Sequence, residues 1–282
     1  MPLLIAVSIL WALSFGLTAQ VSGLGAPFVA ATRTVLAALV FLPFLDLKGL
    51  PSRRILAFAG IGALQFGLMY LLYIASFRWL QASEAALFTI FTPLFVTLAS
   101  DLLEHRFSWL VLLAAALAVA GTGICVWTGL GRQGLLRGFL LMQGANLCFA
   151  LGQVLYRRAV PGTGKRDRDL MGLLYLGAAT VAVAMALPAV DWGRALAMTP
   201  RQGAVLLYLG LVASGLGFFL FNAGARRTDI GTLAVFNNLK IPLAILASGL
   251  LFREAVDWPR LGLGGAVLAS ALGVNALAGR RR

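Results

Sequence analysis

Apolar blocks of about twenty residues recur along the whole chain, and they limit its possible folds more than any other feature. A helix that crosses a hydrocarbon layer about 30 Å thick needs roughly 20 apolar residues. Blocks near that length are Pro2–Gln20, Ala26–Leu45, Ile55–Phe77, Ala82–Leu103, Trp109–Thr128, Gly138–Tyr156, Leu170–Pro188, Ala204–Asn222, Gly231–Phe252 and Leu261–Leu277. The third and fourth are the hardest to separate, because only Arg78 to Glu84 interrupts them. We therefore predict an all-α integral membrane protein with ten transmembrane helices.

The composition agrees with a lipid bilayer as the main partner. Hydrophobic residues make up 60% of the chain and charged residues 12%, against about 45–50% and 25% in ordinary soluble domains. The net charge of +13 is spread over short clusters between apolar blocks and forms no continuous polar face, so we expect no nucleic-acid partner.

Basic residues indicate the orientation, since Lys and Arg collect in short cytoplasmic loops. With the N-terminus inside, the cytoplasmic loops hold Lys48, Arg53, Arg54, Arg106, Arg157, Arg158, Lys165, Arg166, Arg168, Arg226, Arg227, Arg280, Arg281 and Arg282. The opposite loops hold Arg78, Arg132, Arg137, Arg194, Arg201, Arg253 and Arg260. This two-to-one ratio favours both termini in the cytoplasm.

The two halves of the chain resemble each other. Pro93–Glu104 is similar to Pro242–Glu254, and Gly67–Ala75 is similar to Gly215–Ala223 at an offset of 148 residues. Five helices per half is an odd number, so the second half enters the membrane from the opposite face and the two repeats are inverted. We assign the repeats to residues 1–130 and 137–279. Inverted halves favour an alternating-access mechanism.

Two prolines fall at equivalent places in the two halves. Pro93 and Pro242 each remove a backbone hydrogen bond and loosen the helix around them, so we interpret them as paired gating positions near a substrate path. The alternative is a structural role, since prolines are tolerated in membrane helices when neighbours satisfy the freed carbonyl.

Taken together, these residues resemble the drug/metabolite transporter superfamily, specifically its tandem EamA-type permeases, and among them the YddG-type aromatic amino-acid exporters. The likeness is carried by Trp11–Phe15, Arg33, the two Pro-to-Glu segments, Ala120–Gly123 and Ala269–Gly273. Ala114–Ala116 departs from the family, which usually has a glycine there. The resemblance implies a central cavity between the helices. It also implies a secondary transporter that exports small metabolites, including aromatic amino acids, across a bacterial inner membrane. A nucleotide-sugar or drug carrier of the same superfamily is the alternative.

Away from the ends of the predicted spans, the charged residues are Arg33 and Lys240, and such residues are functional candidates. No Asp or Glu lies at mid-depth, which disfavours proton antiport through a buried carboxylate. Lys240 suits a carboxylate or other anionic group on the substrate; alternatively it extends to the interface or binds backbone carbonyls. Arg33 lies near the start of its span, which favours a structural role.

Amides and aromatic rings complete the predicted substrate site. Gln143, Asn146 and Gln153 share one face of the sixth helix, where they either line a cavity or join helices. The other polar candidates are Asn222, Asn237 and Asn238. The aromatic candidates, which would stack on a flat or apolar substrate, are Trp11, Phe15, Tyr70, Tyr73, Phe91 and Phe218.

Residues for catalysis are scarce. Hydrolytic or metal chemistry needs convergent acids, histidines or cysteines, whereas the single histidine, His105, lies in a short loop and Cys125 and Cys148 have no CxxC spacing. We expect no enzyme activity, no metal and no cofactor. The expected partner is a small molecule, an amino acid or related metabolite, and the expected state is a monomer. An assembly protein without transport is a further alternative.

Overall fold

Long helices dominate the computed structural model, which describes residues 2–104, 133–227 and 240–253 without 242 and 246, and isolated positions within 109–120 and 258–277. No strand occurs within these ranges. The helices are α1 (Pro2–Val21), α2 (Ala26–Phe41), α3 (Ser52–Gly62), α4 (Met69–Ser76), α5 (Ala82–Phe88), α6 (Thr92–Glu104), α8 (Leu135–Ala159), α9 (Asp167–Ala189), α10 (Trp192–Leu196), α11 (Pro200–Leu207) and α12 (Gly217–Ala225).

Seven helical stretches in the described ranges are long and apolar enough to cross a membrane. They are Leu3–Leu24, Ala26–Phe44, Ser52–Ser76, Ala82–Leu103, Leu135–Ala159, Asp167–Ala189 and Pro200–Ala225. These stretches match predicted spans one to four and six to eight, including the division near residue 80. The predicted fifth and tenth spans, apart from isolated positions, and the first part of the ninth lie outside the described residues.

The lateral surface of the bundle is apolar. Leu56 is 75% exposed, and Leu39, Leu140 and Leu187 are each more than half exposed. Large leucine side chains on several helices facing outward are unfavourable in water but not in lipid tails. The outer surface therefore supports the prediction of a membrane environment.

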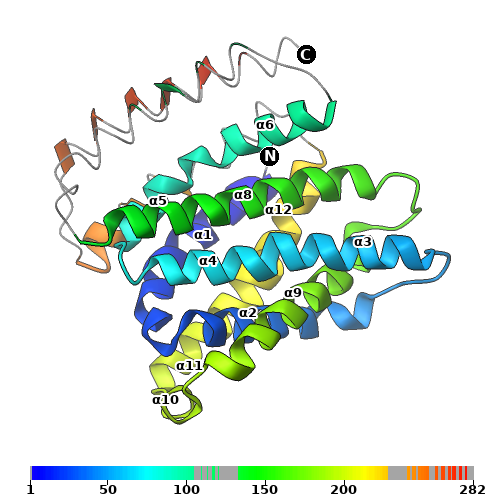
Figure 1. Cartoon of the computed structure of the whole chain (residues 1–282), viewed down its shortest axis with the longest axis horizontal. Coiled ribbons are helices and arrows are strands. Elements are labelled where there is room, and N and C mark those ends of the chain that lie inside the picture. Colours follow the sequence, from blue (N-terminus) through cyan, green and yellow to red (C-terminus); the bar gives the residue numbers. More distant parts are fainter. Residues whose placement is uncertain are drawn as a thin grey trace.

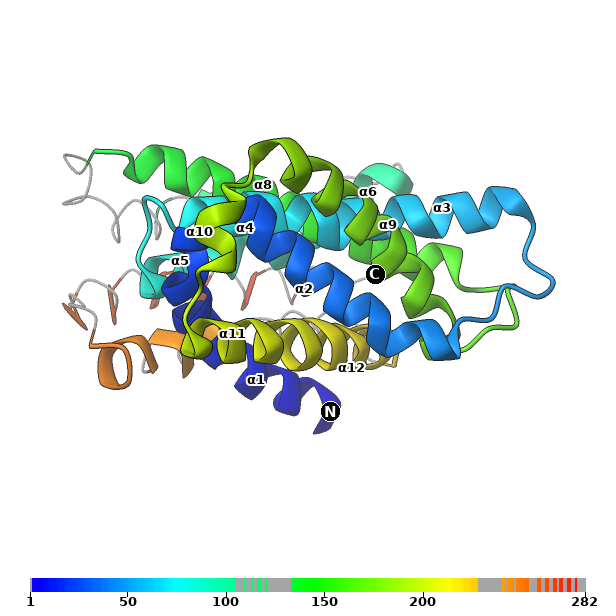
Figure 2. The ribbon, with the colours of Figure 1, turned by 90° about the horizontal axis from the view of Figure 1, so that it is seen from below.

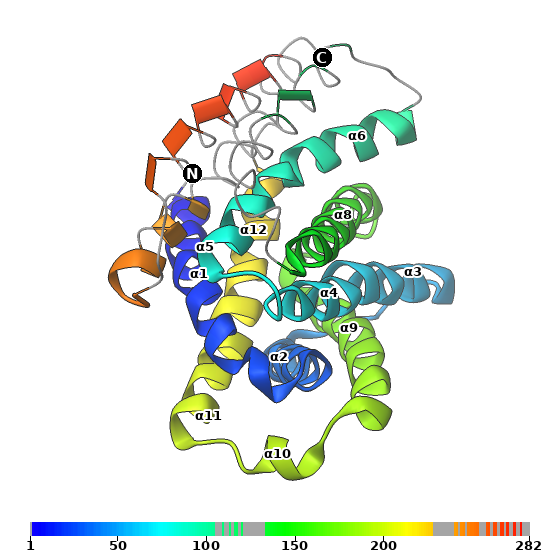
Figure 3. The ribbon, with the colours of Figure 1, turned by 60° about the vertical axis from the view of Figure 1, so that its left-hand side comes forward.

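Equivalent helices of the two halves run in opposite directions (Figure 1). The pair α3–α4 runs from right to left in that view, whereas α11–α12 runs from left to right, and α2 and α9 are likewise opposed. Helix α12 packs beside α1, as Figure 2 also shows. Helix α9 packs against α2 and α3 on the outside of the bundle (Figure 3). These directions are those expected for inverted halves.

Glycines let α3 and α9 pack closely. A Cβ atom at Gly62 would collide with the carbonyl oxygen of Leu174, and one at Gly177 would collide with that of Ala59. Small residues permit this close approach between membrane helices. The contact holds α9 against the inner helices from outside.

A stretch of π-helix interrupts the same helix in each half. The segment η3 (Ala63–Leu68) joins α3 to α4, and η6 (Tyr208–Leu216) joins α11 to α12. Residues 63–68 correspond to 211–216 at the repeat offset of 148, so the two irregular stretches overlap. π-helices are rare and are frequent at functional sites.

Basic residues concentrate at the end of the bundle where α8, α12 and the loop before α3 meet. We refer to this as the basic end; among the described residues it carries Lys48, Arg53, Arg54, Arg157, Arg158, Lys165, Arg166, Arg168, Arg226 and Arg227. The opposite end carries Arg78, Arg137, Arg194, Arg201 and Arg253 within the same ranges. The distribution follows the alternation of loops expected from the sequence.

Candidate functional site

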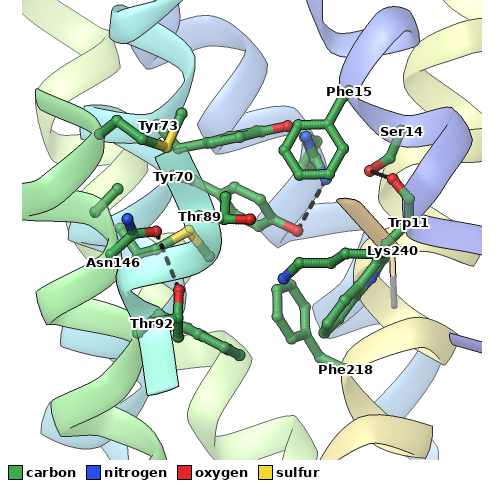
Figure 4. A pocket seen from close by; sticks show the side chains of 15 residues that line it. Trp11, Ser14, Phe15, Tyr70, Tyr73, Thr89, Thr92, Asn146, Phe218 and Lys240 are labelled. Atoms are coloured by element: carbon green, nitrogen blue, oxygen red, sulfur yellow. Dashed lines mark hydrogen bonds between the residues drawn. The ribbon is translucent and has the colours of Figure 1, made fainter. Parts of the chain in front are cut away.

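A cavity lies in the middle of the bundle, between α1, α2, α4, α6, α8 and α12. The space between its lining side chains is about 540 Å³ including the open space at its mouth. Its lining residues are Trp11, Ser14, Phe15, Arg33, Met69, Tyr70, Tyr73, Thr89, Thr92, Met142, Ala145, Asn146, Phe149, Phe218 and Lys240. Figure 4 shows how they converge. We call this the central cavity.

Arg33 is held in the wall of the central cavity by three hydroxyl groups. Its Nε donates to Ser214 Oγ (3.1 Å), Nη1 to Thr18 Oγ1 (3.1 Å) and Nη2 to Tyr70 Oη (2.9 Å). The side chain is buried, and its guanidinium carbon lies 4.1 Å from the centre of the Tyr70 ring. The hydroxyls and the ring replace water around the cation without neutralising its charge.

Lys240 brings a second cation into the same space. Its side chain is only 6% exposed, and its Nζ lies 5.0 Å from the centre of the Trp11 ring. Figure 4 shows it extending between Trp11 and Phe218 toward the middle of the cavity. Lys240 therefore does not extend to the membrane surface.

Aromatic rings make the apolar part of the wall. Trp11 contacts Phe149 and Phe218, with ring centres 6.3 and 4.7 Å apart, and Phe15 contacts Tyr73 at 5.9 Å. Trp11 is fixed further by donating from Nε1 to the Ala213 carbonyl (2.9 Å). Rings held in this way offer flat faces to an apolar ligand.

Asn146 connects the cavity wall to the broken helix before Pro93. Helix α5 ends at Phe88, and the 3₁₀ turn η4 (Thr89–Phe91) separates it from α6. Asn146 Nδ2 donates to the Phe88 carbonyl (2.8 Å), as does Gln143 Nε2 (3.3 Å). The two amides therefore satisfy a carbonyl at the break, which is the structural role that the sequence left open for this stripe.

The structure brings together seven of the predicted site residues. Trp11, Phe15, Tyr70, Tyr73, Asn146, Phe218 and Lys240 all line the central cavity. Tyr70 and Phe218 are equivalent at the repeat offset of 148, and their ring centres lie 5.9 Å apart. Related positions of the two halves thus face each other across the site.

The other predicted positions lie elsewhere. Phe91 packs in a separate apolar cluster with Leu87, Leu94 and Ile241, because the 3₁₀ turn directs it away from the cavity. Pro93 follows the helix break but does not line the cavity. Gln143 binds the Phe88 carbonyl from outside the lining set.

Gln153 and Asn222 line a second cavity at the basic end, apart from the central one. Asn237, Asn238 and Pro242 lie outside the described residues.

Sequence reasoning missed several lining residues. Met142, Ala145 and Phe149 flank Asn146 on one helical face, so the periodicity that identified Asn146 could have found them. Ser14 lies beside Trp11 and Phe15 in the same motif. Arg33 was assigned a structural role; its three hydrogen bonds support that role, and it also lines the cavity.

The central cavity can bind an anionic group and an apolar body together. Both of its charged lining residues, Arg33 and Lys240, are cations, and no Asp or Glu occurs among the described lining residues. Asn146, Thr89 and Thr92 add uncharged donors and acceptors. Within the described ranges, no group of three or more His, Cys, Asp or Glu residues could hold a metal ion.

Known proteins resemble this chain over its whole length. The model of the EamA-like transporter family matches it twice, at residues 1–127 and 136–276. A protein of Pseudomonas aeruginosa described as "Probable biotin transporter" is 42% identical over 285 residues, which cover 100% of this chain and 99% of that protein.

Two relatives from other bacteria carry a similar description. A "Biotin transporter" of Salmonella typhimurium is 37% identical over 98% of this chain and 92% of its own length. The "Biotin transporter" of Escherichia coli is 36% identical with the same coverage. A solved crystal structure aligns over 99% of this chain and 97% of its own, with a TM-score of 0.68 and 18% identity, which shows a common fold alone.

These matches confirm that the chain is a multi-pass membrane transporter and not an enzyme. They do not extend to the aromatic amino-acid exporters that the sequence resembles, because the relatives are described as transporters of biotin.

Proposed function

Because the chain belongs to the EamA-like transporter family, we propose that it carries biotin across the bacterial inner membrane by alternating access. The relatives described as biotin transporters support this substrate. The observation that carries the proposal is the pair of buried cations, Arg33 and Lys240, in an aromatic cavity whose described lining residues include no carboxylate.

The chemistry of biotin is complementary to the central cavity. Its carboxylate can bind Lys240, and it can also accept from Arg33, whose terminal nitrogens each carry a further N–H beside the one given to Thr18 or Tyr70. The fused rings can lie against Trp11 and Phe218. The ureido group can exchange hydrogen bonds with Asn146 and with hydroxyls of the wall.

An amino-acid substrate fits the described lining less well. Its ammonium group would need an anionic partner, whereas the charged side chains of the cavity are Arg33 and Lys240. Two cations at low dielectric oppose an ammonium group as strongly as they attract a carboxylate. The aromatic amino-acid exporter expected from the sequence is therefore the second candidate, supported by the ring-lined wall.

The transport mechanism follows from inverted halves. We propose ten helices in two repeats, residues 1–130 and 137–279, and the opposite directions of α2 and α9 support this. The basic end would face the cytoplasm, as expected for loops rich in Lys and Arg. Movement of one half against the other would open the central cavity to each side in turn.

Flux into liposomes that contain the purified protein tests the substrate. We expect saturable uptake of radiolabelled biotin, inhibited by unlabelled biotin but not by its methyl ester, which lacks the charge that Lys240 and Arg33 bind. Unlabelled phenylalanine and threonine are added as competitors, to test whether amino acids bind the same site. Radiolabelled biotin placed either inside or outside the vesicles measures the direction of transport, which the resemblance predicts to be export. Absence of biotin flux, or equal inhibition by acid and ester, contradicts the proposal.

Removing one cation tests the site. Charge-assisted hydrogen bonds contribute about 1.5–3 kcal/mol, so Lys240→Met should raise the KM for biotin roughly 10- to 100-fold. The matched control is Lys48→Met, which removes the same charge from an exposed loop at the basic end and should leave the KM unchanged. An unchanged KM in Lys240→Met would place the substrate elsewhere.

A further inference from the structure

A second cavity opens at the basic end of the bundle. Its volume is about 1040 Å³ including the space at its mouth, compared with about 540 Å³ for the central cavity. The lining side chains that matter for its chemistry are Ser100, Gln153, Arg157, Arg158, Asn222 and Arg226. We call it the basic cavity.

Two buried amides in the wall of the basic cavity each have one polar atom without a hydrogen-bond partner among the described residues. Gln153 is 6% exposed and Asn222 is 1% exposed, and neither Nε2 of Gln153 nor Oδ1 of Asn222 has a partner in the structure. Burying polar atoms in this way is unfavourable unless something binds them. Both side chains line the same hollow, so a polar ligand there would satisfy them.

Arginines give the basic cavity a positive charge. Arg226 is paired with Asp167, with Nη1 and Oδ1 2.7 Å apart, and Arg158 donates to the Leu103 carbonyl at 3.4 Å. Arg157 makes no hydrogen bond or ion pair within the described ranges. The charged residues among the described lining are all arginines, Arg157, Arg158 and Arg226, so the cavity favours an anion.

The basic cavity and the central cavity are stacked along the same two helices. On α8, Asn146 lines the central cavity and Gln153 the basic one, two turns or about 10 Å further on. On α12, Phe218 and Asn222 are related in the same way one turn apart. Along these helices, Phe149 lies between Asn146 and Gln153, and Phe221 lies between Phe218 and Asn222. The ring centres of Phe149 and Phe221 are 5.6 Å apart.

We infer that the basic cavity is a second carboxylate site on the transport path, where the arginines and Nε2 of Gln153 bind the carboxylate of the substrate before it enters the central cavity or after it leaves. Oδ1 of Asn222 can accept from an N–H donor of the same substrate. The inference rests on the proposed function for the identity of the substrate. Its anion preference is a property of the cavity alone. The aromatic pair Phe149 and Phe221 separates the two sites in the conformation seen here.

Charge-selective labelling tests the anion preference without any assumption about biotin. A single cysteine is placed in the cavity wall by Ser100→Cys, in full-length protein carrying Cys125→Ala and Cys148→Ala. We expect an anionic methanethiosulfonate reagent to react severalfold faster than a cationic one, after each rate is divided by that with a free thiol. Arg157→Gln should lower this ratio and Arg227→Gln, a neighbouring exposed arginine outside the lining set, should not.

Protection by a simple carboxylate tests binding. Hexanoate should slow labelling of Ser100→Cys with a neutral reagent, and removing the amide donor by Gln153→Leu should weaken the protection. Lack of charge preference, or lack of protection by hexanoate in the starting protein, overturns the inference even if biotin is transported.

Sided kinetics then test the place of the site on the path. Gln153→Leu should raise the KM for biotin presented at the basic end roughly tenfold, which corresponds to about 1.4 kcal/mol, and leave the KM from the opposite face unchanged. Equal rises from both faces would assign Gln153 to the central site and overturn the inference. Anion-selective labelling in a protein that carries no biotin would refute the proposed substrate and leave the anion site intact.

Discussion

Tyr70 Oη and Ser214 Oγ lie 2.7 Å apart, although 144 residues separate them in the chain. Each also binds Arg33, and Ser214 Oγ donates to the Leu209 carbonyl (2.6 Å), five residues earlier in the π-helix η6. The irregular winding of η6 thus places a hydroxyl where a buried cation needs an acceptor. One network joins α2, α4 and η6 around the central cavity.

Removing the Tyr70 hydroxyl should destabilise the protein more than removing an ordinary one. Tyr70→Phe keeps the ring but deprives both Arg33 and Ser214 of a partner, at a cost of about 1–3 kcal/mol. The measurement is thermal unfolding of the protein in detergent micelles. Tyr208→Phe is the control, because Tyr208 makes a single partly buried hydrogen bond, to the Leu10 carbonyl at 3.2 Å. Equal effects of the two substitutions would mean that the network adds nothing.

The contact between α3 and α9 predicts opposite effects at two nearby glycines. Gly62→Ala forces a methyl group into the Leu174 carbonyl and should cost roughly 1–3 kcal/mol by overpacking. At Gly60 no atom lies within 4 Å of a Cβ atom, so Gly60→Ala should stabilise the helix by about 0.5–1 kcal/mol. Thermal unfolding of both variants checks the pair, and a stable Gly62→Ala protein would contradict the close packing.

An ion pair at the basic end predicts a dependence of stability on acid. Lys165 Nζ binds Asp46 Oδ2 at 2.5 Å. That hydrogen bond, together with one from the Lys48 backbone, holds the pKa of Asp46 below its ordinary value of 3.8. Because the pKa is lower in the folded state, the stabilisation is present above the ordinary pKa of about 4 and is lost as pH falls below it toward the lower pKa of the folded state.

Unfolding temperatures between pH 7 and pH 3 measure this effect. The fall toward low pH should be shallower in Asp46→Asn, which has no carboxylate to protonate, and in Lys165→Met, which has no cation to pair with Asp46. A slope identical to that of the unmodified protein in both variants would show that other groups cause the acid sensitivity.

The ring pair between the two cavities predicts a leak when one ring is removed. Phe221 also contacts Trp11, with ring centres 5.0 Å apart, so Phe221→Ala should join the central and basic cavities. The rate of efflux of preloaded biotin from liposomes should then rise severalfold, and it should level off less as the internal biotin concentration increases. Phe219→Ala removes the same kind of ring two positions earlier on α12, where it packs against Phe41; this control should leave efflux unchanged. A similar efflux from both variants would rule out the ring pair as the barrier.

Helices were predictable from the sequence because a bilayer imposes one length and one composition on every span. The chain direction in each half followed from counting helices. The depth of each side chain along the bundle axis could not be predicted from the sequence, because periodicity reports only which face of a helix a residue occupies. Asn146 and Gln153 share a face of α8, yet they open into different cavities two turns apart.

The surroundings of Arg33 were also beyond the sequence. Its position near the start of a span indicated a structural residue, but its partner Ser214 lies 181 residues away. Aromatic candidates such as Trp11 and Tyr70 could be identified by type and by repeat position. Phe91, of the same type, packs in another cluster, because a local 3₁₀ turn changes its direction and no simple pattern signals that turn.

A stretch of π-winding holds one more residue than the same length of α-helix. If η6 released that residue, everything after it would turn by about 100° and advance by about 1.5 Å along the axis. Phe218 and Asn222 would then swing out of their cavities together. The π-helix η3 occupies the corresponding place before Tyr70. A small change of winding in either π-helix would therefore rotate the following helix and change which side chains line the substrate path.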